Sequence, residues 1–166
     1  MTTGAAYVAR HGSTAPLLFV DADLQETAVE TAVLTTPVLA GSADMTVAVL
    51  PEQVTKGGGR GLVVNLARGG IERATGFVAT QPLSGMRCLT REAFDAAQPL
   101  AHGWGVEVGL TIDVLRAGLR VAEVPCALQH RVSGGDLRSS LHRGAQYRDV
   151  RRALLARRLR ALTRRG

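Results

Sequence analysis

The chain has 166 residues, of which 46% are apolar and 20% charged. This composition is typical of a globular domain that buries a core, and it excludes a disordered chain. No apolar stretch is long enough to cross a bilayer. The net charge of +6 is unevenly placed, because residues 134–166 hold ten arginines and two aspartates, whereas residues 1–133 have more acids than bases. The basic character therefore belongs to the C-terminal segment.

The N-terminus lacks the charged-then-apolar layout of a signal peptide. The two cysteines, Cys88 and Cys126, are far apart and have no Cys/His spacing typical of zinc sites. We expect both to be core or near-core thiols in a reducing cytoplasm. The predicted localisation is therefore cytoplasmic.

The predicted elements alternate between strands and helices, after a segment, residues 1–16, that indicates no firm element. Apolar runs predict strands over residues 17–20, 44–50, 86–89 and 119–124, the last continuing as extended chain to residue 132 before a turn over residues 133–136. Helical spacing predicts helices over residues 25–39, 62–75, 91–97, 107–117 and 137–163. Glycine marks loops over residues 51–61, 81–85 and 101–106, a helix end at Gly118 and a break of the last helix near Gly144. This alternation predicts an α/β fold.

Two carboxylates follow the first predicted strand, in the stretch L-L-F-V-D-A-D-L. Asp21 and Asp23 have two interpretations. Either one of them caps the next helix, as Asp often does, or both aim at one point and hold Mg²⁺ or Mn²⁺, which prefer carboxylate oxygens. The spacing by itself does not separate these alternatives.

Four segments together resemble the family 2 glycosyltransferases with a GT-A fold: L-L-F-V-D-A-D-L, P-L-S-G-M-R, H-G-W-G-V-E-V-G-L-T-I-D and V-P-C-A-L-Q-H-R-V-S-G. In order and spacing the likeness covers residues 17–150. It is nearer to actinobacterial members related to glucosyl-3-phosphoglycerate synthases and dolichyl-phosphate sugar transferases. The resemblance implies an α/β, GT-A-like (Rossmann-like) mixed sheet flanked by helices. It also implies transfer of a sugar from a nucleotide-diphosphate donor to a hydroxyl acceptor, small or lipid-linked.

The resemblance also assigns a metal site. It implies that Asp23 binds Mg²⁺ or Mn²⁺ directly, that Asp21 contacts the donor ribose or a metal-bound water, and that His130 supplies a further ligand. Such a cation would act as a Lewis acid on the donor diphosphate. Without the resemblance, a histidine beside an arginine at a strand end is an ordinary surface residue.

The remaining candidate residues concern the two substrates, and each keeps a structural alternative. Leu83, Ser84 and Gly85 would form the loop that faces donor sugar and acceptor, or an ordinary turn. Arg87 would pair with a phosphate, or be a solvated strand charge. Glu107 would orient or deprotonate the acceptor hydroxyl, or merely complement a helix dipole. Trp104 would line the acceptor pocket, or be part of the core.

The family has base-binding strands before its D-x-D strand, and only sixteen residues precede Leu17 here. We therefore expect a GT-A-like domain over residues 1–134 that lacks the family's first strands, and a basic amphipathic helix over residues 135–166. Leucines at helical spacing between arginines favour either contact with an anionic membrane at its inner face or a packed helix with a solvated arginine face.

Other function classes stay open as alternatives to a transferase. Nucleic-acid binding is disfavoured because only 4% of the residues are aromatic and no base-reading motif is present. A catalytically inactive fragment could act as an interaction or nucleic-acid/membrane-binding protein. A homodimer would cover the sheet edge that the absent strands leave exposed.

Overall fold

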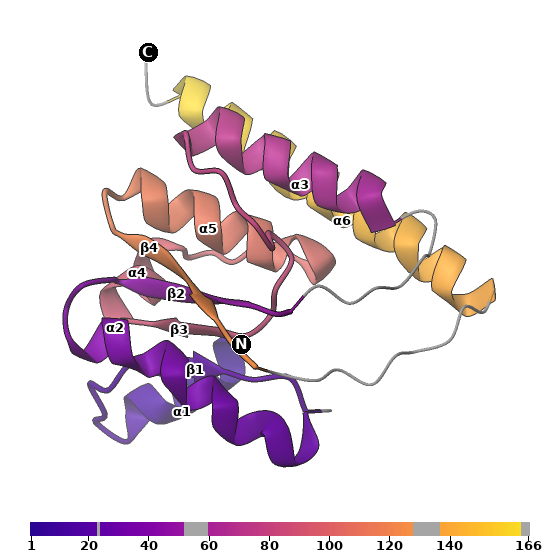
Figure 1. The fold of residues 1–166 in the computed structure, drawn as a ribbon. Coiled ribbons are helices and arrows are strands. Elements are labelled where there is room, and N and C mark those ends of the chain that lie inside the picture. Colours follow the sequence, from indigo (N-terminus) through magenta and orange to yellow (C-terminus); the bar gives the residue numbers. More distant parts are fainter. Residues whose placement is uncertain (23, 52–59, 128–136, 164–166) are drawn as a thin grey trace.

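A mixed four-stranded sheet organises the chain, in the order β1-β3-β2-β4 (Figure 1). Its strands are β1 (Leu17–Phe19), β2 (Met45–Val49), β3 (Arg87–Leu89) and β4 (Val121–Pro125). The structure is a computed structural model, and it describes residues 1–22, 24–51, 60–127 and 137–163. Strand β3 runs antiparallel to both neighbours, with Phe19 paired to Arg87, whereas β2 and β4 are parallel. The segment that follows β1 therefore lies at the same edge as the segment that precedes β3.

Helices surround the sheet, and they are joined by two 3₁₀ segments, η1 (Gln25–Leu34) and η2 (Gly103–Gly105). The α-helices are α1 (Thr2–Arg10), α2 (Thr35–Leu39), α3 (Arg60–Thr75), α4 (Arg91–Ala96), α5 (Val106–Arg116) and α6 (Leu137–Thr163). The predicted mixed α/β fold is thereby confirmed. None of the helices in the described ranges is both long and apolar enough to cross a membrane.

Strand β2 shows why the sheet is covered on both faces. Successive side chains of a strand point to opposite faces. Met45 and Val47 pack with Leu110 and Val114 of α5, whereas Ala48 packs on the other side with Leu34 and Val38 of η1 and α2. Every residue from Met45 to Ala48 is buried, so both faces belong to the core.

Helix α5 joins the sheet to an outer pair of helices. Leu110 and Val114 face the sheet, and Val108 and Ile112 face a separate cluster with Ile71 of α3 and Val150 of α6. Figure 1 shows α3 and α6 side by side beyond α5. Helix α6 therefore packs into the same body as the sheet; the predicted domain boundary after residue 134 lies outside the described residues.

Two sequence predictions were wrong in the N-terminal part. Residues 1–16 contain helix α1, whose Ala5 is buried against Leu17 and Phe94. The helix predicted over residues 25–39 winds as a 3₁₀ segment until Leu34. There the hydroxyls of Thr27 and Thr31 donate to the carbonyl three residues earlier, at 2.7 and 2.6 Å. Such local side-chain bonds compete with regular α-helical winding.

Several local predictions were confirmed. Gly118 has a φ of +79° after α5, which is the left-handed conformation expected at a helix end. Cys88 and Cys126 are both buried and free. One local prediction was wrong, because helix α6 continues through Gly144 without the expected break. The loop predicted over residues 51–61 and the extended chain predicted to residue 132 lie largely outside the described residues, as does the turn predicted over residues 133–136.

Candidate active site at the end of strand β1

The antiparallel pairing of β1 and β3 places Asp21 beside the loop of residues 82–85. The nearest approach is at Gly85, where an added Cβ would lie 3.0 Å from Oδ1 of Asp21. A side chain at this position would press on the carboxylate, since real Cβ atoms rarely come so close. The absence of a side chain at Gly85 thus makes room for the first carboxylate of the D-x-D stretch. Asp23 lies outside the described residues.

Arg87, the first residue of β3, anchors this loop by hydrogen bonds to its backbone. Its side chain is fully buried. The guanidinium donates from Nε to the carbonyl oxygen of Ser84 at 2.8 Å, from Nη1 to Oγ1 of Thr111 at 2.9 Å, and from Nη2 to the carbonyl oxygen of Pro82 at 3.4 Å. The alternative of a solvated strand charge is therefore wrong, and Arg87 links the loop to α5.

Burial and nearby charges oppose each other at Arg87. Burial lowers the pKa of Arg87 to about 10, and the carboxylates of Glu107 and Glu123 act in the opposite direction. At neutral pH the side chain still carries its proton. A buried positive charge thus interacts with two acids and bonds the loop of residues 82–85.

Two further polar residues anchor the start of the loop, and sequence reasoning missed both. The side-chain amide of Gln81 donates to the carbonyl of Leu50 at 2.6 Å and accepts from its N–H at 3.0 Å. Oε1 of Glu123 accepts from the N–H groups of Thr80 and Gln81 at 2.7 and 3.2 Å. The sequence offers one sign of this role: Glu123 is an acid inside an otherwise apolar strand, and a polar side chain there needs a hydrogen-bond partner.

Glu107 is the second residue of α5 and is half-buried. Burial raises the pKa of Glu107; its own backbone N–H and the charge of Arg87 lower it, and Asp21 raises it further. Electrostatic influence from both Asp21 and Arg87 places Glu107 in the same cluster. Oγ1 of Thr111 also donates to the carbonyl of Glu107 at 3.0 Å, so Thr111 connects this turn to Arg87.

Ser84 supplies an unused hydroxyl in this cluster. Its Oγ is buried and makes no hydrogen bond with any residue that the structure describes. A buried polar atom without a partner costs about 1–3 kcal/mol, so it suits a site that is completed by a ligand.

The oxygen-rich character of the cluster fits a hard divalent cation. Asp21 and Glu107 are like charges, and a cation near them would relieve their repulsion. Within the described ranges, no group of three or more His, Cys, Asp or Glu side chains lies together. Because Asp23 and His130 fall outside those ranges, the predicted ligand set stays a prediction.

Two candidate residues lie differently from the sequence-based expectation. Leu83 is half-buried and packs against the cluster formed by α3, α5 and α6, so part of its side chain belongs to the core. Trp104 is 41% exposed, so the alternative that it is a core residue is wrong. Its backbone N–H donates to Oδ2 of Asp149 in α6 at 3.4 Å, which holds η2 against that helix.

Solved structures of glucosyl-3-phosphoglycerate synthase from Mycobacterium tuberculosis are similar to this chain. The complex with phosphoglyceric acid has a TM-score of 0.67 at 31% identity and covers 92% of this chain and 53% of that one. The complex with Mn²⁺, uridine diphosphate and phosphoglyceric acid has a TM-score of 0.67 at 28% identity, covering 92% and 52%. The complex with Mg²⁺ and uridine diphosphate has a TM-score of 0.65 at 28% identity, covering 92% and 53%.

The chain has a GT-A glycosyltransferase fold. It spans about half the length of these solved enzymes. No protein-family model matches the sequence, and no curated protein matches it. The sequence resemblance to GT-A enzymes of the glucosyl-3-phosphoglycerate synthase kind is confirmed by the structural likeness. In this GT-A fold the Asp21–Gly85 contact, Arg87 and Glu107 lie together where β1 ends and β3 begins.

Proposed function

We propose that the chain carries the metal and acceptor part of a glycosyltransferase that moves a sugar from a nucleotide-diphosphate donor to a hydroxyl acceptor. The observation that carries this proposal is the approach of Asp21 to Gly85 with Glu107 in electrostatic contact, within a GT-A fold. The solved relatives support it, because they are complexes with Mn²⁺ or Mg²⁺ and a uridine nucleotide.

In the proposed donor site, Asp21, Asp23 and His130 hold Mg²⁺ or Mn²⁺. A bound cation of this kind neutralises charge on the departing diphosphate. The hydroxyl of Ser84 and the backbone of residues 83–85 face the donor sugar. Arg87 acts on the ligand through this loop, because its guanidinium is buried and bonded to the carbonyls of Ser84 and Pro82.

In the proposed acceptor site, Glu107 orients the hydroxyl that forms the new bond to the sugar, and it can take up the proton that this hydroxyl loses. Its raised pKa brings the carboxylate nearer to the pH at which a general base works well. Trp104, exposed on η2 just before α5, would line the acceptor pocket.

The substrates and setting belong to the same proposal. The relatives' complexes contain uridine diphosphate glucose with phosphoglyceric acid or glycerol 3-phosphate, which supports a uridine nucleotide and a small hydroxyl acceptor here, with a lipid-linked acceptor as the alternative. We place the protein in the cytoplasm. A homodimer through β1, the end strand of the sheet in the described ranges, is a further proposal, and its test is the molar mass in solution.

The test is calorimetric titration of the full chain with UDP and with GDP, each with and without Mn²⁺. We expect binding that requires the metal, and we expect Asp23→Ala to abolish it. Asp95→Ala, which removes an exposed acid on α4, is the matched control and should bind as the unchanged chain does. Binding that is independent of metal, or equal loss in both variants, would contradict the proposed site.

The same titration decides the main alternative. If neither nucleotide binds and circular dichroism shows that the chain is folded, the chain is an inactive glycosyltransferase fragment. Its function would then be an interaction, for which nucleic acid and membrane are the two candidates.

A further inference from the structure

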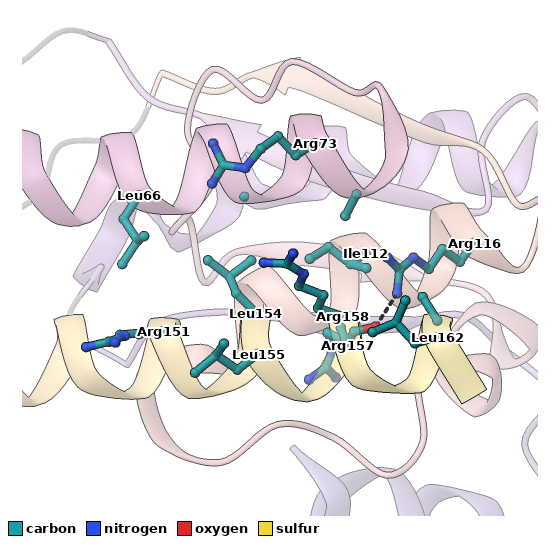
Figure 2. Close-up of a pocket in the computed structure, with 13 residues that line it drawn as sticks. Leu66, Arg73, Ile112, Arg116, Arg151, Leu154, Leu155, Arg157, Arg158 and Leu162 are labelled. Atoms are coloured by element: carbon teal, nitrogen blue, oxygen red, sulfur yellow. Dashed lines mark hydrogen bonds between the residues drawn. The ribbon is translucent and has the colours of Figure 1, made fainter. Parts of the chain in front are cut away.

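A groove lies between helices α3, α5 and α6, away from the site at the end of β1. Its volume is about 530 Å³. Figure 2 shows that its apolar lining includes Leu66 of α3, Ile112 of α5 and Leu154 of α6. Helices α3 and α6 are close at Gly70, where an added Cβ would lie 2.4 Å from Cδ2 of Leu154. The groove is therefore built by close helix packing.

Next to this groove, α6 presents a stripe of leucines to solvent. Leu155, Leu159 and Leu162 are 49%, 64% and 61% exposed. Their spacing of four and three residues places them on one helix face. Leu155 and Leu162 also line the groove, so the stripe and the groove form one apolar surface, called the leucine face below. Exposed contiguous apolar surface of this kind marks an interaction site.

Arginines lie along the leucine face. Arg151 precedes Leu155 by four residues and Arg158 follows it by three, so both share the same side of α6. Both side chains are exposed, and neither makes a hydrogen bond or ion pair with a residue that the structure describes. They are separated by seven residues, which is about 10 Å along a helix.

The groove carries net positive charge. Arg73 and Arg116 line it together with Arg151 and Arg158, and no Asp or Glu is among the lining residues. Arg157 is the exception among its arginines, because it is buried and paired with Asp113 of α5. Figure 2 shows Arg116 bonded to the carbonyl oxygen of Arg157, at 2.8 Å. Arg116 and Arg157 thus have partners within the protein, whereas Arg151 and Arg158 keep exposed charges beside the groove.

We propose that the leucine face docks on the surface of an anionic phospholipid membrane. A helix with leucines on one side, flanked by cationic side chains, lies in the plane of such a surface with its apolar side chains among the headgroups. A single small anion would meet only one or two guanidinium groups, whereas a planar anionic surface meets Arg151 and Arg158 together. Nucleic acid would neutralise the arginines and leave the three leucines in water. This docking is independent of transferase activity.

The test is co-sedimentation of the full chain with vesicles. Vesicles of phosphatidylcholine alone are compared with vesicles of phosphatidylcholine and phosphatidylglycerol at about 70:30, at low and at high salt. We expect binding to the anionic vesicles only, and release at high salt, because salt screens exposed charges. Each arginine near such a surface contributes about 1 kcal/mol, so Arg151→Gln with Arg158→Gln should weaken binding about 30-fold.

Two matched controls separate the leucine face from general charge or apolarity. Arg10→Gln, at an exposed position of α1, removes one positive charge outside the leucine face and should reduce binding far less than Arg151→Gln or Arg158→Gln alone. Leu159→Glu should abolish binding, whereas Leu39→Glu, at a leucine of α2 that is 70% exposed, should not. Circular dichroism of the unchanged chain and of every variant first establishes that each is folded.

Three outcomes overturn the proposal. They are absence of binding to the anionic vesicles, equal loss in the variants and their controls, and binding that Leu159→Glu leaves intact. Binding of a 20-nucleotide single strand that depends on Arg151 and Arg158 but not on Leu159, without vesicle binding, would assign the face to nucleic acid instead.

Discussion

Replacing Arg87 by methionine tests how the loop of residues 82–85 is held. Methionine has a similar length but no donor, so the bonds to the carbonyl oxygen of Ser84 and to Oγ1 of Thr111 would be lost. Glu107 and Glu123 would lose the buried positive charge with which both interact. We expect a less stable protein with a loosened loop.

The magnitude follows from three opposing contributions. Two good hydrogen bonds from a charged donor contribute about 1.5–3 kcal/mol each. The cost of burying the charge, indicated by the pKa of about 10, offsets about 3 kcal/mol of this. Acceptors left buried without a partner cost about 1–3 kcal/mol. We therefore expect Arg87→Met to lower the free energy of unfolding by about 3 kcal/mol.

Urea unfolding at neutral pH measures this loss, and hydrogen exchange at the amides of Gln81 and Ser84 measures the loosening of the loop. Arg10→Met, at an exposed position of α1, is the control and should change stability by less than about 0.5 kcal/mol. Arg87→Lys keeps the positive charge but loses the planar guanidinium with its several donors. Its loss of stability should therefore be smaller than that of Arg87→Met and larger than that of Arg10→Met. If Arg87→Met unfolds like the unchanged chain and its loop exchanges at the same rate, the anchoring role of Arg87 is refuted.

Two further predictions concern packing and pH. Gly105→Ala should destabilise the fold by about 2 kcal/mol, because the added Cβ would lie 2.7 Å from the backbone oxygen of Asp149. Gly144→Ala, whose added Cβ would have no atom within 4 Å, should stabilise α6 by about 0.8 kcal/mol. Equal shifts of the thermal unfolding temperature in the two variants would contradict this. Hydrogen bonds from Arg120 lower the pKa of Asp44 below its ordinary value. Ionised Asp44 therefore stabilises the folded protein at any pH above that ordinary pKa, and this stabilisation is lost as the pH falls through the lowered pKa. We expect Asp44→Asn to be less stable than the unchanged chain near neutral pH and equally stable at the acidic end. Urea unfolding between pH 7 and pH 2 measures the difference, and a difference that does not change with pH would refute this linkage.

Local order along the chain was largely determined by the sequence itself. The alternating residues of β2 and the helical spacing of α3 and α5 are local patterns, and the structure has these elements within one or two residues of the predicted ends. The left-handed Gly118 was also predicted, because a glycine avoids the steric cost of a positive φ. The four motifs that resemble GT-A enzymes specified the fold class, since their order and spacing reflect one arrangement of strands and loops.

What only the tertiary structure decided is which polar side chains are buried, and why. In the sequence Arg87 resembles an exposed strand charge, because its partner Thr111 is 24 residues away and only the fold brings the two together. Gln81 and Glu123 read as ordinary polar residues until they meet Leu50 and Thr80, 31 and 43 residues away. Burial of a polar group is stable only when distant partners satisfy it, and no local pattern encodes that distance. The sequence therefore determined the elements and the motif residues, and the packing of strands remote in the chain determined how the loop beside Asp21 is held.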